Sequence, residues 1–160
     1  MRSYVTNALF SLVVLAASAA AAQPSAPSSF PHIPLMSHDT MTYNGKVIYD
    51  AYVDLADPAR KQTTLKIDLD GFSKGCDSLV GHVATDSEWK RSGVSGYSIS
   101  CVVRDLGADG SAKVDVIYSL RDPSRGVNKS EHITATVKSG QRYESTTPTG
   151  TKVTMLLNLQ

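Results

Sequence analysis

KVDVIYSL, residues 113–120, alternates apolar and polar side chains along most of its length. The apolar members are Val114, Val116, Tyr118 and Leu120, and the polar ones include Lys113, Asp115 and Ser119. A period of two places successive side chains on opposite faces of a strand. The stretch therefore predicts a strand that buries one face only, which is typical of an antiparallel sheet.

The same period recurs on both sides of this stretch. It runs through residues 47–55, 64–70, 97–104, 133–138 and 153–159. Gly110, Gly140 and Gly150 each follow a residue that favours turns, which fits short connections between strands. No segment has a helical period, and at most one short helical turn is expected near residues 86–91. We predict an all-β domain, an antiparallel two-sheet sandwich of about seven or eight strands, with a small soluble β-barrel as the alternative.

Residues 1–22 have the composition of a secretory signal peptide. Arg2 precedes an apolar run over residues 8–16, and alanines at 20–22 offer the small side chains before which cleavage sites lie. We expect residues 23–40, where prolines stand among serines, to be a flexible arm, and residues 41–160 to be a single β domain. The protein is therefore expected to be periplasmic or secreted, with no transmembrane segment after processing.

Two cysteines, Cys76 and Cys101, follow the predicted signal peptide. Because export brings thiols into an oxidising compartment, we predict one intramolecular disulfide between them. Closing a loop of this length is worth roughly 3 kcal/mol in the chain-entropy model.

The charge balance excludes one class of partner. The chain has 16 basic and 15 acidic residues, and removal of Arg2 with the signal peptide leaves 15 of each. A protein that binds nucleic acid needs a surplus of Lys and Arg to displace counterions, so we expect no nucleic-acid partner.

No catalytic motif stands out. Ser87 and Lys90 have the Ser-x-x-Lys spacing of acyl-serine enzymes, but the helix that such a serine requires is not predicted. His82 and His132 belong to no recognisable metal or nucleophile motif. We therefore expect a protein that is not an enzyme and has no cofactor. A small secreted hydrolase with a dispersed site remains an alternative, since a triad can assemble from distant residues.

Two places are candidates for binding. Trp89, the only tryptophan, stands beside Lys90 and Arg91 between the two cysteines, as in a recognition loop, although its ring could instead cover the end of the sandwich. Leu156 breaks the alternation of the last strand, so it is either buried beneath the arm or exposed as part of a binding patch.

A further alternative is a metal site in the arm. His32, Met36, His38 and Met41 combine imidazole and thioether groups, which suit copper, and thioether suits Cu(I) especially. That reading predicts a periplasmic copper carrier. The leading hypothesis is an exported, non-enzymatic β domain that binds a protein partner in a cell envelope or secretion assembly, through a sheet edge, the arm or the Trp89 segment. The sequence leaves the oligomeric state open.

Overall fold

A computed structural model describes residues 31–90 and 95–160 of the chain. Over these ranges the backbone forms ten strands and one short 3-10 helix, η1, with no α-helix. The elements are β1 (Met36–Tyr43), β2 (Lys46–Asp54), β3 (Gln62–Leu69), β4 (Phe72–Leu79), β5 (Ala84–Trp89), β6 (Gly96–Arg104), β7 (Ser111–Asp122), η1 (Pro123–Arg125), β8 (Val127–Lys138), β9 (Arg142–Thr146) and β10 (Lys152–Leu159).

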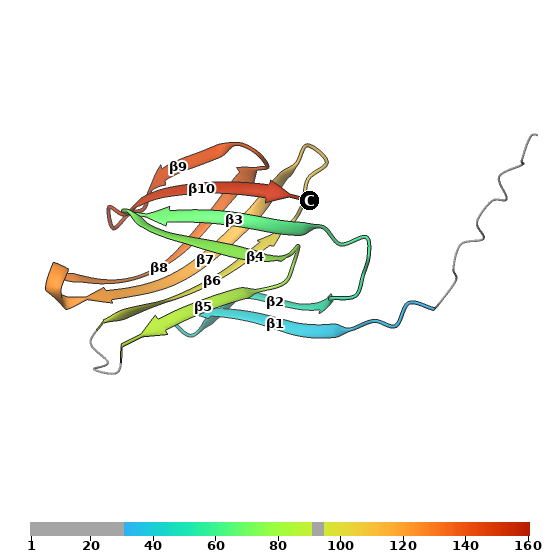
Figure 1. The fold of residues 1–160 in the computed structure, drawn as a ribbon, viewed down its shortest axis with the longest axis horizontal. Helices are drawn as coiled ribbons and strands as arrows, with labels where there is room; N and C mark the ends of the chain where they lie inside the picture. The colour runs from blue at the N-terminus through green and yellow to red at the C-terminus, as the bar shows by residue number, and fades with distance from the viewer. Residues whose placement is uncertain (1–30, 91–94) are drawn as a thin grey trace, which may run out of the picture. The chain divides into compact units, whose positions relative to one another are not determined.

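Eight of these strands form two four-stranded antiparallel sheets. One sheet has the order β4-β3-β10-β9 and the other has the order β5-β6-β7-β8. The two sheets pack face to face as a sandwich and do not close into a barrel (Figure 1). The predicted antiparallel sandwich is therefore confirmed, and the barrel alternative is wrong.

The core lies between the two sheets and follows the period of two. Within the pair β3–β10, Ile67 stands opposite Met155 and Leu65 opposite Leu157, and all four side chains are buried. The second sheet contributes the alternate residues of β6, β7 and β8. Its buried members include Ile99, Cys101, Val103, Val114, Val116, Tyr118, Ile133, Ala135 and Val137.

Residues 84–89 differ from expectation, because they form the edge strand β5 and not a helical turn. Only Ala84 packs against the core, and the other five residues are exposed. An edge strand covered so little has no apolar alternation, which is why its sequence carries no strand signal.

The remaining two strands, β1 and β2, form a separate antiparallel hairpin. Their turn contains Asn44 and Gly45, both with positive φ (49° and 74°), as a tight hairpin turn requires. β1 begins at Met36, so residues 36–40 belong to a strand and not to the predicted arm. Residues 23–30 of that arm, and the predicted signal peptide at 1–22, lie outside the described residues.

The hairpin covers part of the outer face of the sheet that contains β6 and β7. Its Tyr43 hydroxyl donates to the Ser130 carbonyl on β8, and its Tyr49 hydroxyl donates to the carbonyl of Gly81. Val102 points away from the core by the alternation of β6, yet it is 1% exposed. Burial on that face shows that the hairpin adds a third layer over part of the sandwich.

Candidate functional site

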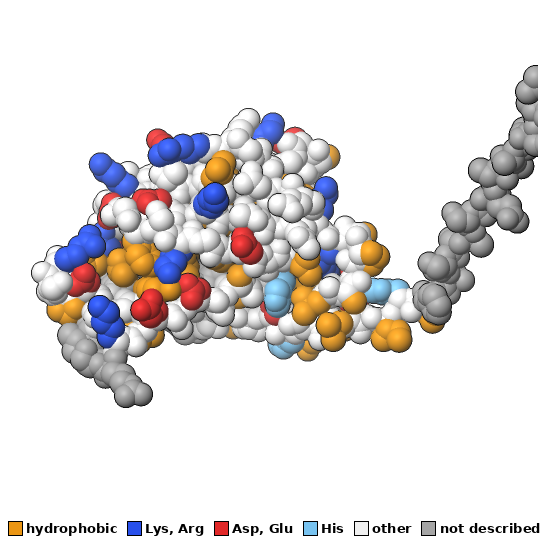
Figure 2. Space-filling view, in the orientation of Figure 1, with side chains coloured by type: hydrophobic (Ala, Val, Ile, Leu, Met, Phe, Trp, Pro, Cys, Tyr) orange, Lys and Arg blue, Asp and Glu red, His pale blue; other side chains and the backbone are white. Residues whose placement is uncertain are grey.

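Exposed apolar side chains gather on and beside the hairpin. Five of the six large hydrophobic side chains that are most exposed among the described residues lie here. They are Ile33, Leu35, Met36, Val47 and Tyr52, and we call them the hairpin surface. Figure 2 shows apolar and histidine side chains together over this part of the molecule. A cluster of this kind, unlike single exposed hydrophobic residues, indicates an interaction site.

Two histidine–aspartate pairs hold the outer side of the hairpin. His38 stacks on the Tyr52 ring, with 4.4 Å between ring centroids and 12° between planes. The Nε2 atom of His38 lies 2.5 Å from a carboxylate oxygen of Asp50. His32 and Asp54 form a second pair, also at 2.5 Å. The hydrogen bond from His32 holds the pKa of Asp54 below its ordinary value. The stack on His38, which Asp50 holds, thus fixes the orientation of the Tyr52 ring.

The opposite face of the hairpin is anchored through the buried carboxylate of Asp39. This carboxylate accepts hydrogen bonds from the Ser37 hydroxyl, from His82 and from the backbone N–H of Val83. Burial alone raises the pKa of Asp39, but these hydrogen bonds outweigh burial and hold the pKa below its ordinary value. Met41 and Val53 on the same face are 2% and 1% exposed.

A second buried carboxylate, Asp115, lies on the outer face of β7. It accepts from Arg104 Nε at 2.8 Å, from Thr134 Oγ1 at 2.6 Å and from His132 Nε2 at 3.1 Å. Burial raises the pKa of Asp115, and these contacts outweigh it and lower the pKa. His132 Nε2 also lies 3.2 Å from Thr134 Oγ1, so a single ring nitrogen contacts both the hydroxyl and the carboxylate, whereas a nucleophilic triad uses the two ring nitrogens separately. The arrangement around Asp115 therefore differs from that of a nucleophilic triad.

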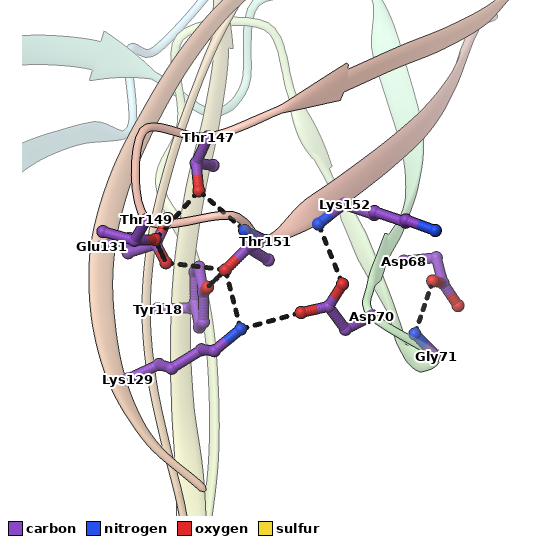
Figure 3. A network of polar contacts seen from close by, with 10 residues as sticks. All are labelled: Asp68, Asp70, Gly71, Tyr118, Lys129, Glu131, Thr147, Thr149, Thr151 and Lys152. Carbon is purple, nitrogen blue, oxygen red and sulfur yellow. Dashed lines mark hydrogen bonds and ion pairs between the residues drawn. The ribbon is translucent and has the colours of Figure 1, made fainter.

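Figure 3 shows a third polar network, which joins the two sheets at one end of the sandwich. Glu131 of β8 accepts hydrogen bonds from the hydroxyls of Thr149 and, at 2.7 Å, Thr151. Lys129, also on β8, reaches Asp70 at 2.8 Å and Thr151 at 3.0 Å. Since Asp70 and Thr151 border β3 and β10, these contacts connect one sheet to the other.

The hydrogen bonds and the ion pair of this network hold the two sheets together. The Tyr118 hydroxyl donates to Thr151 Oγ1 at 3.2 Å, and burial raises the pKa of Tyr118 to about 12. Burial raises the pKa of Glu131, but hydrogen bonds from Thr149 and Thr151 outweigh it and lower the pKa. Thr151 itself is 1% exposed, and its hydroxyl contacts Glu131, Tyr118 and Lys129.

The predicted disulfide is present between Cys76 of β4 and Cys101 of β6. Their Cα atoms are 6.5 Å apart, and each strand belongs to a different sheet. The bond therefore joins the two sheets covalently, at their β4 and β6 strands. No helix in the described ranges is long and apolar enough to cross a membrane.

Trp89 ends β5 and pairs with Gly96 of β6, so it is not on a free loop. A Cβ at Gly96 would lie 2.6 Å from the Trp89 ring, which shows how closely the indole covers that glycine. The indole is still 47% exposed. Lys90 follows β5 and is exposed, whereas Arg91 lies outside the described residues.

Leu156 is half-buried on the outer face of the other sheet, opposite Lys66 of β3 and Arg142 of β9. It lines a shallow hollow beside Gly75. Trp89 and Leu156 therefore lie in different sheets, and the structure does not bring them together.

The hairpin separates the four candidate metal ligands, because they lie on its two different faces. His32, Met36 and His38 are exposed, whereas Met41 is buried on the anchored face. Each of the two histidines already contacts an aspartate. Across residues 31–90 and 95–160, no three His, Cys, Asp or Glu side chains are placed to hold a metal ion.

The hairpin surface is the candidate site that the sequence analysis missed. Asn44-Gly45 between residues 36–43 and 46–54 is a strong hairpin signal and could have located it. Comparison of the chain with protein-family models, curated proteins and solved structures gave no match.

Proposed function

We propose that this protein is an exported, non-enzymatic β domain that binds a protein partner in a cell envelope or secretion assembly through its hairpin surface. The observation that carries the proposal is the exposure of that surface: Ile33 is 80% and Tyr52 70% exposed. Exposing such side chains to water is unfavourable, by about 25 cal/mol per Å² of apolar surface. A partner that covers them gains that free energy on binding.

The construction of the hairpin supports the same function. Asp39, Tyr43 and Tyr49 attach one face to the sandwich by hydrogen bonds. The other face is therefore presented on a supported platform, which reduces the ordering cost of association. Large aromatic side chains with fixed orientation, such as Tyr52 beneath His38, are frequent at the energetic centres of interfaces.

The charges beside the hairpin surface indicate the chemistry of the partner. Asp50 and Asp54 flank Tyr52 along β2, and the Asp50 side chain is 57% exposed. A complementary partner would place apolar side chains on Met36 and Tyr52 and a Lys or Arg beside Asp50. Binding should then weaken as the ionic strength rises, because salt screens exposed charges.

Site-specific photo-crosslinking tests this function. A photoreactive phenylalanine analogue would replace Tyr52 in one protein and the exposed Glu144 of β9 in a control. After irradiation with an envelope fraction, we expect one dominant adduct from position 52 and none from position 144. Excess unlabelled wild-type protein should suppress that adduct, and so should Leu156→Ser. The double variant Met36→Ser/Tyr52→Ser should not suppress it. Equal labelling from both positions, or suppression by all three competitors alike, would overturn the proposal.

A further inference from the structure

The two sheets of the sandwich differ in length, which leaves one end open. β7 and β8 have 12 residues each, whereas β3 and β10 have 8 each. At about 3.3 Å per residue, four extra residues correspond to about 13 Å of strand. Figure 1 shows the tip of β7 and β8, with η1, extending beyond the turn between β3 and β4. The inner face of that tip therefore has no opposing strand.

A cleft of about 620 Å³ lies at this open end, and we call it the end cleft. Its volume is within the range of small-molecule sites. The apolar side chains that line it come from both sheets: Leu69, Phe72, Tyr97, Leu120 and Val127. Tyr97 stands opposite Leu120 in the ladder, and the Phe72 ring lies against Tyr97 with 5.1 Å between centroids. These contacts form a continuous apolar lining.

Three of the four cations that line the end cleft form no ion pair with the described residues. Lys90, Arg121 and Arg125 line the cleft and are exposed. Within residues 31–90 and 95–160, none of the three lies within 4.0 Å of a carboxylate oxygen. Figure 2 shows basic and acidic side chains around an apolar area at this end of the molecule.

Two of the three carboxylates that line the cleft accept hydrogen bonds from other groups of the protein. Asp70 accepts from Lys129 and from the backbone N–H of Lys152. Asp122 accepts from the backbone N–H and hydroxyl of Ser124 at the start of η1. Of the carboxylates that line the cleft, Glu88 makes no such contact with the described residues. Counting Lys129, four cations and three carboxylates line the cleft, which gives its lining a net charge of +1 and leaves its mouth electropositive.

We propose that the end cleft binds an amphipathic anion, a carboxylate that carries an apolar chain, such as a medium-chain fatty acid. The chain would lie on Phe72, Leu120 and Val127, and the carboxylate would face Arg121 and Arg125. Charge complementarity at the mouth selects an anion over a cation with the same chain. The site is separate from the hairpin surface, so failure of either proposal leaves the other standing.

Decanoate and decylammonium, which share a chain and differ in charge, provide the test. Calorimetric titration of the full protein should show at least tenfold tighter binding of decanoate. Arg121→Gln/Arg125→Gln should remove most of that preference. The control Lys61→Gln/Lys138→Gln removes the same amount of charge. Both lysines are exposed and far along the strands from the cleft, Lys61 just before β3 and Lys138 at the end of β8, so this variant should leave binding unchanged.

Amide chemical shifts measured in the same titration locate the bound decanoate. We expect the largest changes at residues 69–72, 97 and 118–129. Equal affinity for the two probes would overturn the proposal, and so would equal loss of binding in both double variants. Shifts confined to residues 33–54 would overturn it too. Because both arginines are exposed, their replacement is not expected to unfold the protein.

Discussion

His82 Nδ1 lies 2.5 Å from a carboxylate oxygen of Asp39, which comes 43 residues earlier in the chain. This pair attaches β1 to the segment just before β5, and the carboxylate is almost fully buried. Removing one member of a buried charge-assisted pair leaves the other without a partner, which costs more than losing an exposed pair.

Asp39→Asn should therefore lower the free energy of unfolding by about 2 kcal/mol, the middle of the range for hydrogen bonds to charged groups. Urea unfolding at pH 7 measures the change. The matched control is Asp50→Asn, which breaks the exposed pair with His38 and should cost less than about 1 kcal/mol. Equal losses in the two variants would contradict the anchoring role of Asp39.

The effect of Asp39 should also depend on pH. Its folded pKa is lowered below the value of about 3.9 expected in the unfolded chain. The carboxylate therefore contributes its stability above about pH 4 and loses it as the pH falls through the folded pKa. The difference between wild type and Asp39→Asn should shrink between pH 5 and pH 2, as followed by urea midpoints. If the stability difference between wild type and Asp39→Asn grew on acidification, the pKa of Asp39 would be raised by folding and not lowered.

The disulfide should supply a large part of the stability. Cys76→Ser/Cys101→Ser should lower the free energy of unfolding by about 2–5 kcal/mol, the usual effect of losing a native disulfide. Titration of the unreduced, denatured protein should find no free thiol, because both cysteines are bonded. The same titration after reduction should find two, which is the control for accessibility of the reagent.

Neighbouring leucines of β10 test which face of that strand is buried. Leu157 is fully buried, so Leu157→Ala should cost about 2–5 kcal/mol. The same substitution at half-buried Leu156 should cost less than about 1 kcal/mol, because its side chain lies on the outer face. If Leu156→Ala proves as costly as Leu157→Ala, the alternation of β10 has been misassigned.

Tyr118 should limit stability at high pH. Its folded pKa of about 12 exceeds the unfolded value of about 10, so its contribution is complete below about pH 10 and is lost as the pH rises towards 12. Tyr118→Phe should flatten the fall in stability over that interval, as measured by urea midpoints at pH 9 and pH 11. In the folded wild type, phenolate absorbance should show one tyrosine ionising near pH 12 that the variant lacks. An unchanged absorbance titration in the variant would contradict this assignment.

The sandwich could be predicted from sequence because each core strand buries one face. Val114, Val116 and Tyr118 alternate visibly for that reason, and Cys101 shares the period of its strand. β5 could not be predicted in this way, because a polar edge strand is defined by its ladder with β6 and not by its own pattern. The first strand of the hairpin, β1, was missed for another reason. β2 shows the usual alternation, with Val53 buried and Asp50 exposed, but β1 does not, because Met36 is exposed and Asp39 is buried.

The position of the hairpin in the chain has a consequence for folding. Its two strands are local in sequence, but an isolated two-stranded hairpin is marginally stable in water. Its described anchors, Gly81, His82, Val83 and Ser130, all come later in the chain. During synthesis the hairpin is therefore made before the sandwich that supports it, and its docking can be completed only after β8, which carries Ser130, has been added. The first described strands to be made are thus among the last to be secured, and until then Met41 and Val53 stay open to solvent or to a chaperone.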